Sequence, residues 1–197
     1  MEPFEIIMSP FEVYVAPVGT AFPEPEAAIA ATWKLLGKNG IRNQSEDGVT
    51  ISHEQTTQEH RTNGSTGPVK VVRPEESLTI GLTIEDLTIE MYSQVIGNAM
   101  TEQTVGVGVA GIRSVDLHRG ATVQTLALLV RGASPYLDGQ NMQYEVPRCF
   151  QAASPKPKFS KKDAAGLELL YTALEDGNAA SDAARFGRLR AIYSPAT

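Results

Sequence analysis

A long polar run between two strand-like segments is the feature that most constrains this sequence. Residues 49–52 follow the turn dipeptide Asp47-Gly48 and alternate apolar and polar side chains, as a half-buried strand does. Residues 52–68 contain no large apolar side chain, so hydrophobic burial cannot hold them against the rest of the protein. A run of this length is uncommon inside a compact domain unless it is functional or disordered. The sequence therefore predicts a long arm at about residues 52–68 that projects as an extended hairpin tip.

The segment after the arm carries the most regular alternation in the chain. Over residues 77–84 every second side chain is apolar, which is typical of a strand with one buried face. These apolar positions are Leu78, Ile80, Leu82 and Ile84. Residues 85–96 have the spacing of a helix, and Gly97 is suited to end it. The apolar positions four apart in this helix are Leu87, Met91 and Val95.

The rest of the chain is predicted to form mainly strands, in one domain over residues 1–197. Strand patterns occur at residues 11–15, 112–116, 121–130, 142–150, 167–173 and 186–193. Consecutive apolar residues at 126–130 indicate burial on both faces, or on one face against a neighbouring subunit. Pro147 indicates an edge or a bulge, because proline cannot donate a hydrogen bond to a ladder. The alanines of residues 27–36 favour a short helix.

The charges argue against a protein that grips nucleic acid. The 197 residues carry 17 lysines and arginines and 23 aspartates and glutamates, a net charge of −6, whereas phosphate binding needs a clustered basic face. The balance is −8 over residues 1–98 and +2 over residues 99–197. This asymmetry suits a protein whose one side docks on another side of a second copy.

No set of residues has the spacing of a catalytic or metal site. His53 and His60 lie in the arm beside two glutamates, but their spacing matches no zinc pattern and a polar arm offers no rigid frame. Adjacent carboxylates at residues 75–76 and 85–86 face apart, so neither makes an acid–base pair. The glycine-rich residues 106–111 lack the Lys-Ser/Thr pair of a phosphate-binding loop. We expect no enzymatic activity, no cofactor and no metal.

Two further residues have a structural interpretation. Trp33 is expected to anchor the core or to join two elements. Cys149 is the only cysteine and stands in a strand-like run, so it is expected to be a buried, inert thiol.

The order of segments forms a pattern of its own. It begins with Trp33 and the Leu-Gly pair at residues 36–37, and continues with the Asp-Gly strand at residues 47–51, the polar arm, the alternating strand and the helix. The C-terminal half adds a Tyr-x-x-Pro-Arg strand, a basic loop and a strand ending in Ala-Leu-Glu-Asp, at residues 144–148, 152–162 and 173–176. Over roughly residues 10–195, this order resembles the tail tube (major tail) proteins of long-tailed bacteriophages.

That resemblance implies a mainly β fold, a β-sandwich or barrel-like domain with one flanking α-helix and a long projecting loop. It implies hexameric rings whose inner sheets join into one barrel, stacked into a tube that passively conducts double-stranded DNA. The expected partners are other copies of the chain, the terminator, tape measure and baseplate proteins, and DNA in transit without sequence-specific binding, with no membrane. The expected location is the virion tail, assembled in the host cytoplasm. The alternatives are a tail-terminator or secretion-tube-like ring protein, and a monomeric β-sandwich binding module.

In such a tube the arm would reach a neighbouring subunit or ring. The arm residues expected at this contact are His53, Glu54, Gln55, Thr56, Thr57, Gln58, Glu59, His60, Arg61, Thr62 and Asn63. The candidate partners for the arm glutamates are the loop lysines Lys156, Lys158, Lys161 and Lys162. The candidates for the lumen wall are Thr50, Ser52, Ser77 and Thr79. An acidic or neutral lumen would repel phosphate and let DNA slide past.

Overall fold

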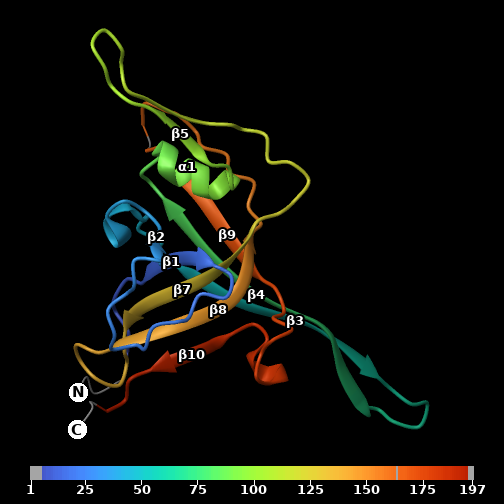
Figure 1. Cartoon of the computed structure of the whole chain (residues 1–197). Helices are drawn as coiled ribbons and strands as arrows, with labels where there is room; N and C mark the ends of the chain where they lie inside the picture. Colours follow the sequence, from blue (N-terminus) through green and yellow to red (C-terminus); the bar gives the residue numbers. More distant parts are fainter. Residues whose placement is uncertain (1–5, 163, 195–197) are drawn as a thin grey trace.

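The computed structural model describes residues 6–162 and 164–194, and it confirms a mainly β fold (Figure 1). Eight antiparallel strands form one sheet in the order β2-β1-β7-β8-β9-β4-β3, with β10 pairing to β8 beside this path. These strands are β1 (Glu12–Pro17), β2 (Lys34–Leu35), β3 (Thr50–His60), β4 (Lys70–Ile84), β7 (Thr125–Ala133), β8 (Asn141–Gln151), β9 (Leu167–Ala173) and β10 (Arg188–Ala191). The other elements are a two-stranded sheet of β5 (Met100–Gln103) and β6 (Ile112–Val115), the helix α1 (Ile89–Ile96), and the 3-10 turns Gly40–Asn43 and Asp182–Ala184.

The large sheet folds over a main core. One buried cluster unites side chains of β1, β7 and β8 with side chains of β4 and β9, which lie further along the same sheet. The sheet must therefore curl until its two halves face each other, as in a sandwich. Val95 of α1 joins the cluster, so the helix covers one end of this core.

The strands with the clearest apolar patterns in the sequence bury the side chains that were predicted to be buried. All four alternating apolar residues of β4 are buried, and so are those of β9. Strand β7 is buried on both faces within a single chain. Its Leu128 and Val130 point into the main core, whereas Ala127 and Leu129 pack on the opposite side in a second cluster with Trp33.

Trp33 holds an irregular connector against the outer face of the sheet. Its indole Nε1 donates a hydrogen bond to the carbonyl of Ala21 at 3.2 Å, and its ring lies 5.1 Å from that of Phe22. The anchoring role of Trp33 is confirmed, but the helix predicted over residues 27–36 is wrong. This segment contains turns and the short strand β2, because contacts with the sheet outweigh the helix propensity of its alanines.

Helix α1 begins four residues later than the sequence predicted. The backbone N–H of Glu85 donates to the carbonyl of Asn43 at 2.7 Å, and the Asp86 carboxylate accepts from the backbone N–H of Lys38 at 2.8 Å. These bonds hold the chain in a non-helical path until Thr88, whose hydroxyl caps the first turn. The helix ends as predicted at Gly97, which adopts the left-handed conformation with a φ of 82°.

Both prolines inside strands lie where the register shifts. Leu126 and Leu128 of β7 pair with Cys149 and Val146 of β8, so β8 has one extra residue around Pro147. Strand β8 is an interior strand, and the bulge, one of the two expected alternatives, is what accommodates its proline. Strand β4 has a corresponding irregularity beside Pro74.

Candidate assembly interface

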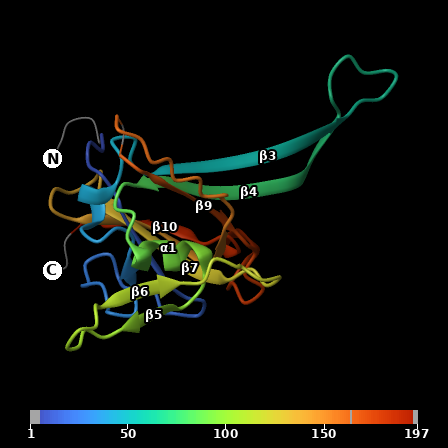
Figure 2. The ribbon, with the colours of Figure 1, turned by 90° about the horizontal axis from the view of Figure 1, so that it is seen from above.

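The polar arm is a two-stranded ribbon that leaves the body of the protein (Figures 1 and 2). Strand β4 pairs with β9 only from Thr79 to Ile84, so the preceding part of β4 pairs with β3 alone. The arm therefore projects as a hairpin, as predicted. It differs from the expected loop in that only residues 61–69 lie between the two strands. Cross-strand backbone hydrogen bonds give it a regular structure although its side chains bury little.

The arm presents mostly polar side chains, and among the described residues each of its two strands has a free outer backbone edge. Glu59 pairs with Arg61 at 3.0 Å, and Glu76 with Arg73 at 3.2 Å, all with exposed side chains. In the part of the chain that the structure describes, no strand pairs with the outer edge of β3. An unpaired edge of this kind can accept a strand from another chain.

The four candidates for a lumen wall share one face of the sheet. The register pairs Thr50 with Gly81, Ser52 with Thr79, and Glu54 with Ser77. Directly opposed residues of an antiparallel pair lie on the same face, and so do residues two apart on a strand. Thr50, Ser52, Ser77 and Thr79 thus form one polar surface on the side away from the main core.

Strand β9 extends this polar surface with residues that the sequence analysis did not assign to it. Thr172 pairs with Thr79, Leu170 with Gly81, and Glu168 with Thr83. The alternation of β9 separates these residues from its buried ones, but only the register shows that they continue the face of β4. The acidic residues of this face are Glu54, Glu75 and Glu168, and no lysine or arginine occupies its positions on β9 or on the β3 and β4 pairs from Thr50 to Thr56.

The basic loop lies far from the tip of the arm within one chain. Residues 152–162 run from β8 past the helix α1, whereas the ribbon projects from the other end of the sheet (Figure 1). The lysines Lys156, Lys158, Lys161 and Lys162 are all exposed there. Any contact between these lysines and an arm tip therefore has to join two copies.

The two arm glutamates proposed as partners of these lysines do not share a face. Glu54 and Glu59 are five residues apart on β3, and strand residues an odd number apart point to opposite faces. Glu59 already pairs with Arg61, whereas the Glu54 carboxylate accepts a 3.4 Å hydrogen bond from Ser52. A flat partner surface would meet Glu54 or Glu59, but not both.

The histidines of the arm also fail to converge. His53 and His60 lie seven residues apart on the extended strand β3, about 23 Å at the usual rise per residue, and they face opposite sides. They cannot bind one ion together within a single ribbon.

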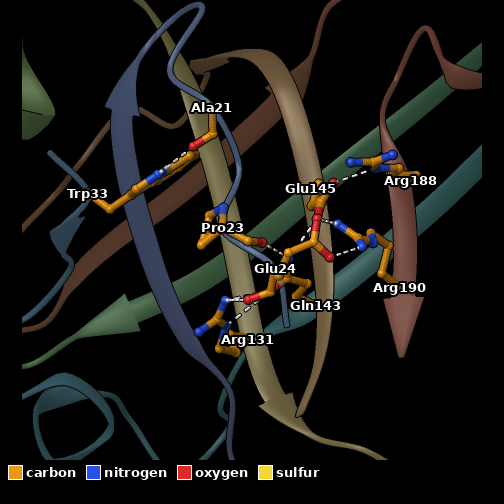
Figure 3. A network of polar contacts seen from close by, with 9 residues as sticks. All are labelled: Ala21, Pro23, Glu24, Trp33, Arg131, Gln143, Glu145, Arg188 and Arg190. Carbon is orange, nitrogen blue, oxygen red and sulfur yellow. Dashed lines mark hydrogen bonds and ion pairs between the residues drawn. The ribbon is translucent and has the colours of Figure 1, made fainter. Parts of the chain in front are cut away.

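A buried polar network fastens the connector across the outer face of the sheet (Figure 3). The register sets Arg131 of β7, Gln143 of β8 and Arg190 of β10 in one row, and Glu145 and Arg188 in the next. The Arg131 guanidinium donates to Gln143 Oε1 at 2.7 Å and to the carbonyl of Ala27 at 2.7 Å. Arg131 thereby joins the connector from the N-terminal part of the sequence to two strands of the C-terminal half.

Glu145 is the buried acid of this network and is 1% exposed. It accepts from Gln143 Nε2 at 2.6 Å, from Arg188 Nε at 2.5 Å and from Arg190 at 3.4 Å. Arg190 also pairs with Glu24 of the connector, and this hydrogen bond lowers the pKa of the Glu24 carboxyl. A buried carboxylate with several charged donors is satisfied, so its function is to hold the structure together. The polar and charged side chains that alternate at positions 143 and 145 and at 188 and 190 were the available sequence signal for this network.

A family model described as "Phage tail tube protein" matches residues 6–186. The chain belongs to the phage tail tube family. A search of curated proteins finds no match to it. Membership places this tail tube protein in the tail of a phage particle and implies that it assembles with itself and with other tail proteins.

The family is structural, which agrees with the expectation of a non-enzymatic protein. Cys149 of this tail tube protein is fully buried, and burial raises the pKa of its thiol to about 12, so it is the inert thiol that the sequence predicted. Among the described residues, no helix is long and apolar enough to span a bilayer.

Proposed function

We propose that the protein forms hexameric rings that stack into the tail tube, with the β3–β4 ribbon linking one copy to the next. The observation that carries this proposal is the ribbon itself. It extends beyond the sheet, exposes polar side chains on both strands and leaves the edge of β3 free. Because its backbone is already regular, the ribbon loses less conformational entropy on binding than a disordered arm would.

The positions of the charged segments support a contact between copies in different rings. The arm carries acidic residues at one end of the protein, and the basic loop runs near α1 at the other (Figure 1). Stacking copies in one direction brings opposite ends together, so an arm can approach the basic loop of the next ring. Glu54 is the arm carboxylate free to meet Lys156, Lys158, Lys161 or Lys162, since Glu59 pairs with Arg61.

The polar face of β3, β4 and β9 is our candidate for the lumen wall. Hydroxyl groups dominate it, and up to the register shift after Thr56 its charged members, Glu54, Glu75 and Glu168, are acidic. Such a wall repels phosphate and gives DNA no site at which to bind. DNA would then pass through the tube without sequence-specific contact.

Each copy would act as one unit with a projecting arm, assembled in the host cytoplasm. The tube would contact terminator, tape measure and baseplate proteins at its ends and inside. A tail-terminator or secretion-tube-like protein would give single rings, and a monomeric binding module would give neither rings nor tubes. Electron microscopy of the purified protein distinguishes the three outcomes.

The ribbon can be removed without disturbing the sheet, because it pairs only with itself. Glu54 and Ser77 are opposed, so a two-residue Asn-Gly turn can join them in place of residues 55–76. We expect a folded protein that no longer elongates into tubes, seen by circular dichroism and electron microscopy. Replacing residues 62–67 of the tip by an equally long Gly-Ser sequence is the matched control for chain alteration alone. Normal tubes from the shortened protein would overturn the linking role of the ribbon.

A further inference from the structure

Two exposed apolar features lie at opposite ends of the protein. The first is the hairpin of β5 and β6, whose residues 103–112 carry no charge. Its valines are unusually exposed for a soluble surface, with Val105 at 73% and Val107 at 106%. The second is a hollow of about 410 Å³ at the other end, where β10 and the β7–β8 turn lie (Figure 1).

The hairpin tip is ordered. Gly106 and Val109 exchange two backbone hydrogen bonds of 3.0 Å, which leaves Val107 and Gly108 as a two-residue turn. Gly108 has a φ of 74°, which a side chain would disfavour. The tip is therefore a preformed apolar knob, and binding orders little additional chain.

The hollow is apolar and is also held in shape. Its lining contains no charged side chain and consists of Tyr136, Met142, Leu189, Ala191 and Tyr193. The Ser134 hydroxyl donates to the carbonyl of Ile192 at 2.8 Å, and the Ile192 N–H donates to the carbonyl of Asn141 at 3.2 Å. These bonds fix the segment after β10 beside the β7–β8 turn, so the aromatic walls form in the single chain.

We propose that the β5–β6 hairpin tip of one copy inserts into the Tyr136–Tyr193 hollow of the copy stacked above it. The occupant is a second copy because the family assembles with itself and because knob and hollow are both uncharged, so neither loses charge hydration on contact. This inference rests on the proposed stacked tube and adds its axial contact surface.

The direction of the contact follows from the positions of the two features. Figure 1 places the hairpin and the β10 end at opposite ends of the protein, and Figures 1 and 2 place the hairpin tip and the β7–β8 turn on the same side of it. A copy displaced along the long direction brings its β10 end to the hairpin of its neighbour. Contacts between two different surfaces repeat without closing when displacement is axial, which is what a tube requires.

Cross-linking tests this geometry directly. Val107→Cys combined with Leu189→Cys places one thiol on the knob and one in the hollow, while buried Cys149 does not react. Oxidised tubes should give a ladder of cross-linked species that continues beyond six copies on a non-reducing gel. Either single variant should stop at a dimer or monomer. Tubes without a cross-link, or a ladder that ends at the ring size, would overturn the axial contact.

A charged knob provides the second test. Val107→Asp should fold normally, since its side chain is fully exposed, but raise the protein concentration needed for tubes by at least tenfold. Val107→Leu should assemble as the unaltered protein does. Adding Leu189→Lys to Val107→Asp should restore tube assembly. Normal tubes from Val107→Asp would overturn the inference alone. Absence of tubes from the unaltered protein would instead overturn the proposed function on which it rests.

Discussion

A single guanidinium, that of Arg131, joins the connector to two strands of the sheet. It donates to Gln143 and to the carbonyls of Glu24 and Ala27, at distances between 2.7 and 3.0 Å. Burial lowers the pKa of Arg131, but an arginine remains charged at any physiological pH. The cation is therefore a buried charge whose partners are fixed carbonyl and amide oxygens.

We predict that Arg131→Leu destabilises the protein by about 3 kcal/mol, because it leaves buried acceptors without donors. Urea unfolding measures this loss, and proteolysis within residues 18–32 should accelerate as the connector loosens. Arg185→Leu is the matched control, since Arg185 makes exposed pairs with Glu175 and Asp182 and its loss should destabilise the protein far less. Equal losses in the two variants would contradict the anchoring role of Arg131.

Sequence reasoning was accurate for residues whose own side chain favours burial. Trp33 and Cys149 are such cases, because large apolar and thiol side chains are buried in most contexts. It could not find the network of Arg131 and Glu145. Those two side chains are charged, and only the pairing of β7, β8 and β10 brings them together.

For helices and strands too, features set by nearby residues were predicted, whereas features set by contacts distant in the sequence were not. The buried faces of β4 and β9 follow from side-chain alternation, and the structure confirms them. The consecutive apolar residues of β7 left two alternatives, of which the structure shows burial on both faces within one chain. The ribbon was harder to predict because nothing in its polar sequence requires the two strands to pair. Backbone hydrogen bonds, which do not depend on the side chains, hold them together. Strand β5 was not predicted because its four residues carry little pattern.

The polar face of β3, β4 and β9 leads to a prediction about DNA passage. Thr79 lies between Ser52 and Thr172, so Thr79→Lys places a cation at the centre of this face. If the face lines the lumen, tubes should still form but should retain DNA, with an affinity that falls steeply as salt increases. Gel retention of DNA by open tubes at two salt concentrations measures this effect.

Thr79→Glu is the control for the size and charge of the new side chain, and its tubes should retain no DNA. If tubes of Thr79→Lys do not retain DNA, the lumen is lined by another face of the protein. Loss of tube formation in both variants would instead place this face between subunits.

For the whole molecule, the opposed ends of the chain set how copies can meet. The arm and the basic loop are separated within one copy, and so are the hairpin tip and the apolar hollow (Figure 1). Each pair is complementary, one in charge and the other in apolar surface. Two independent pairs of features then specify the same stacking direction, and this agreement favours one assembly over alternatives.

The charged pair gives the last prediction. Glu54→Lys should raise the concentration needed for tube formation about fivefold, since an exposed interfacial ion pair contributes on the order of 1 kcal/mol. The effect should vanish at high salt, which screens exposed charges. Adding Lys158→Glu and Lys161→Glu should restore assembly by reversing the pair.

Glu59→Lys is the matched control. It should have a smaller effect, which the loop substitutions do not correct, because Arg61 already neutralises Glu59 and because Glu59 lies on the opposite face of the ribbon from Glu54. Rescue of Glu59→Lys rather than Glu54→Lys would show that the opposite face of the ribbon meets the basic loop.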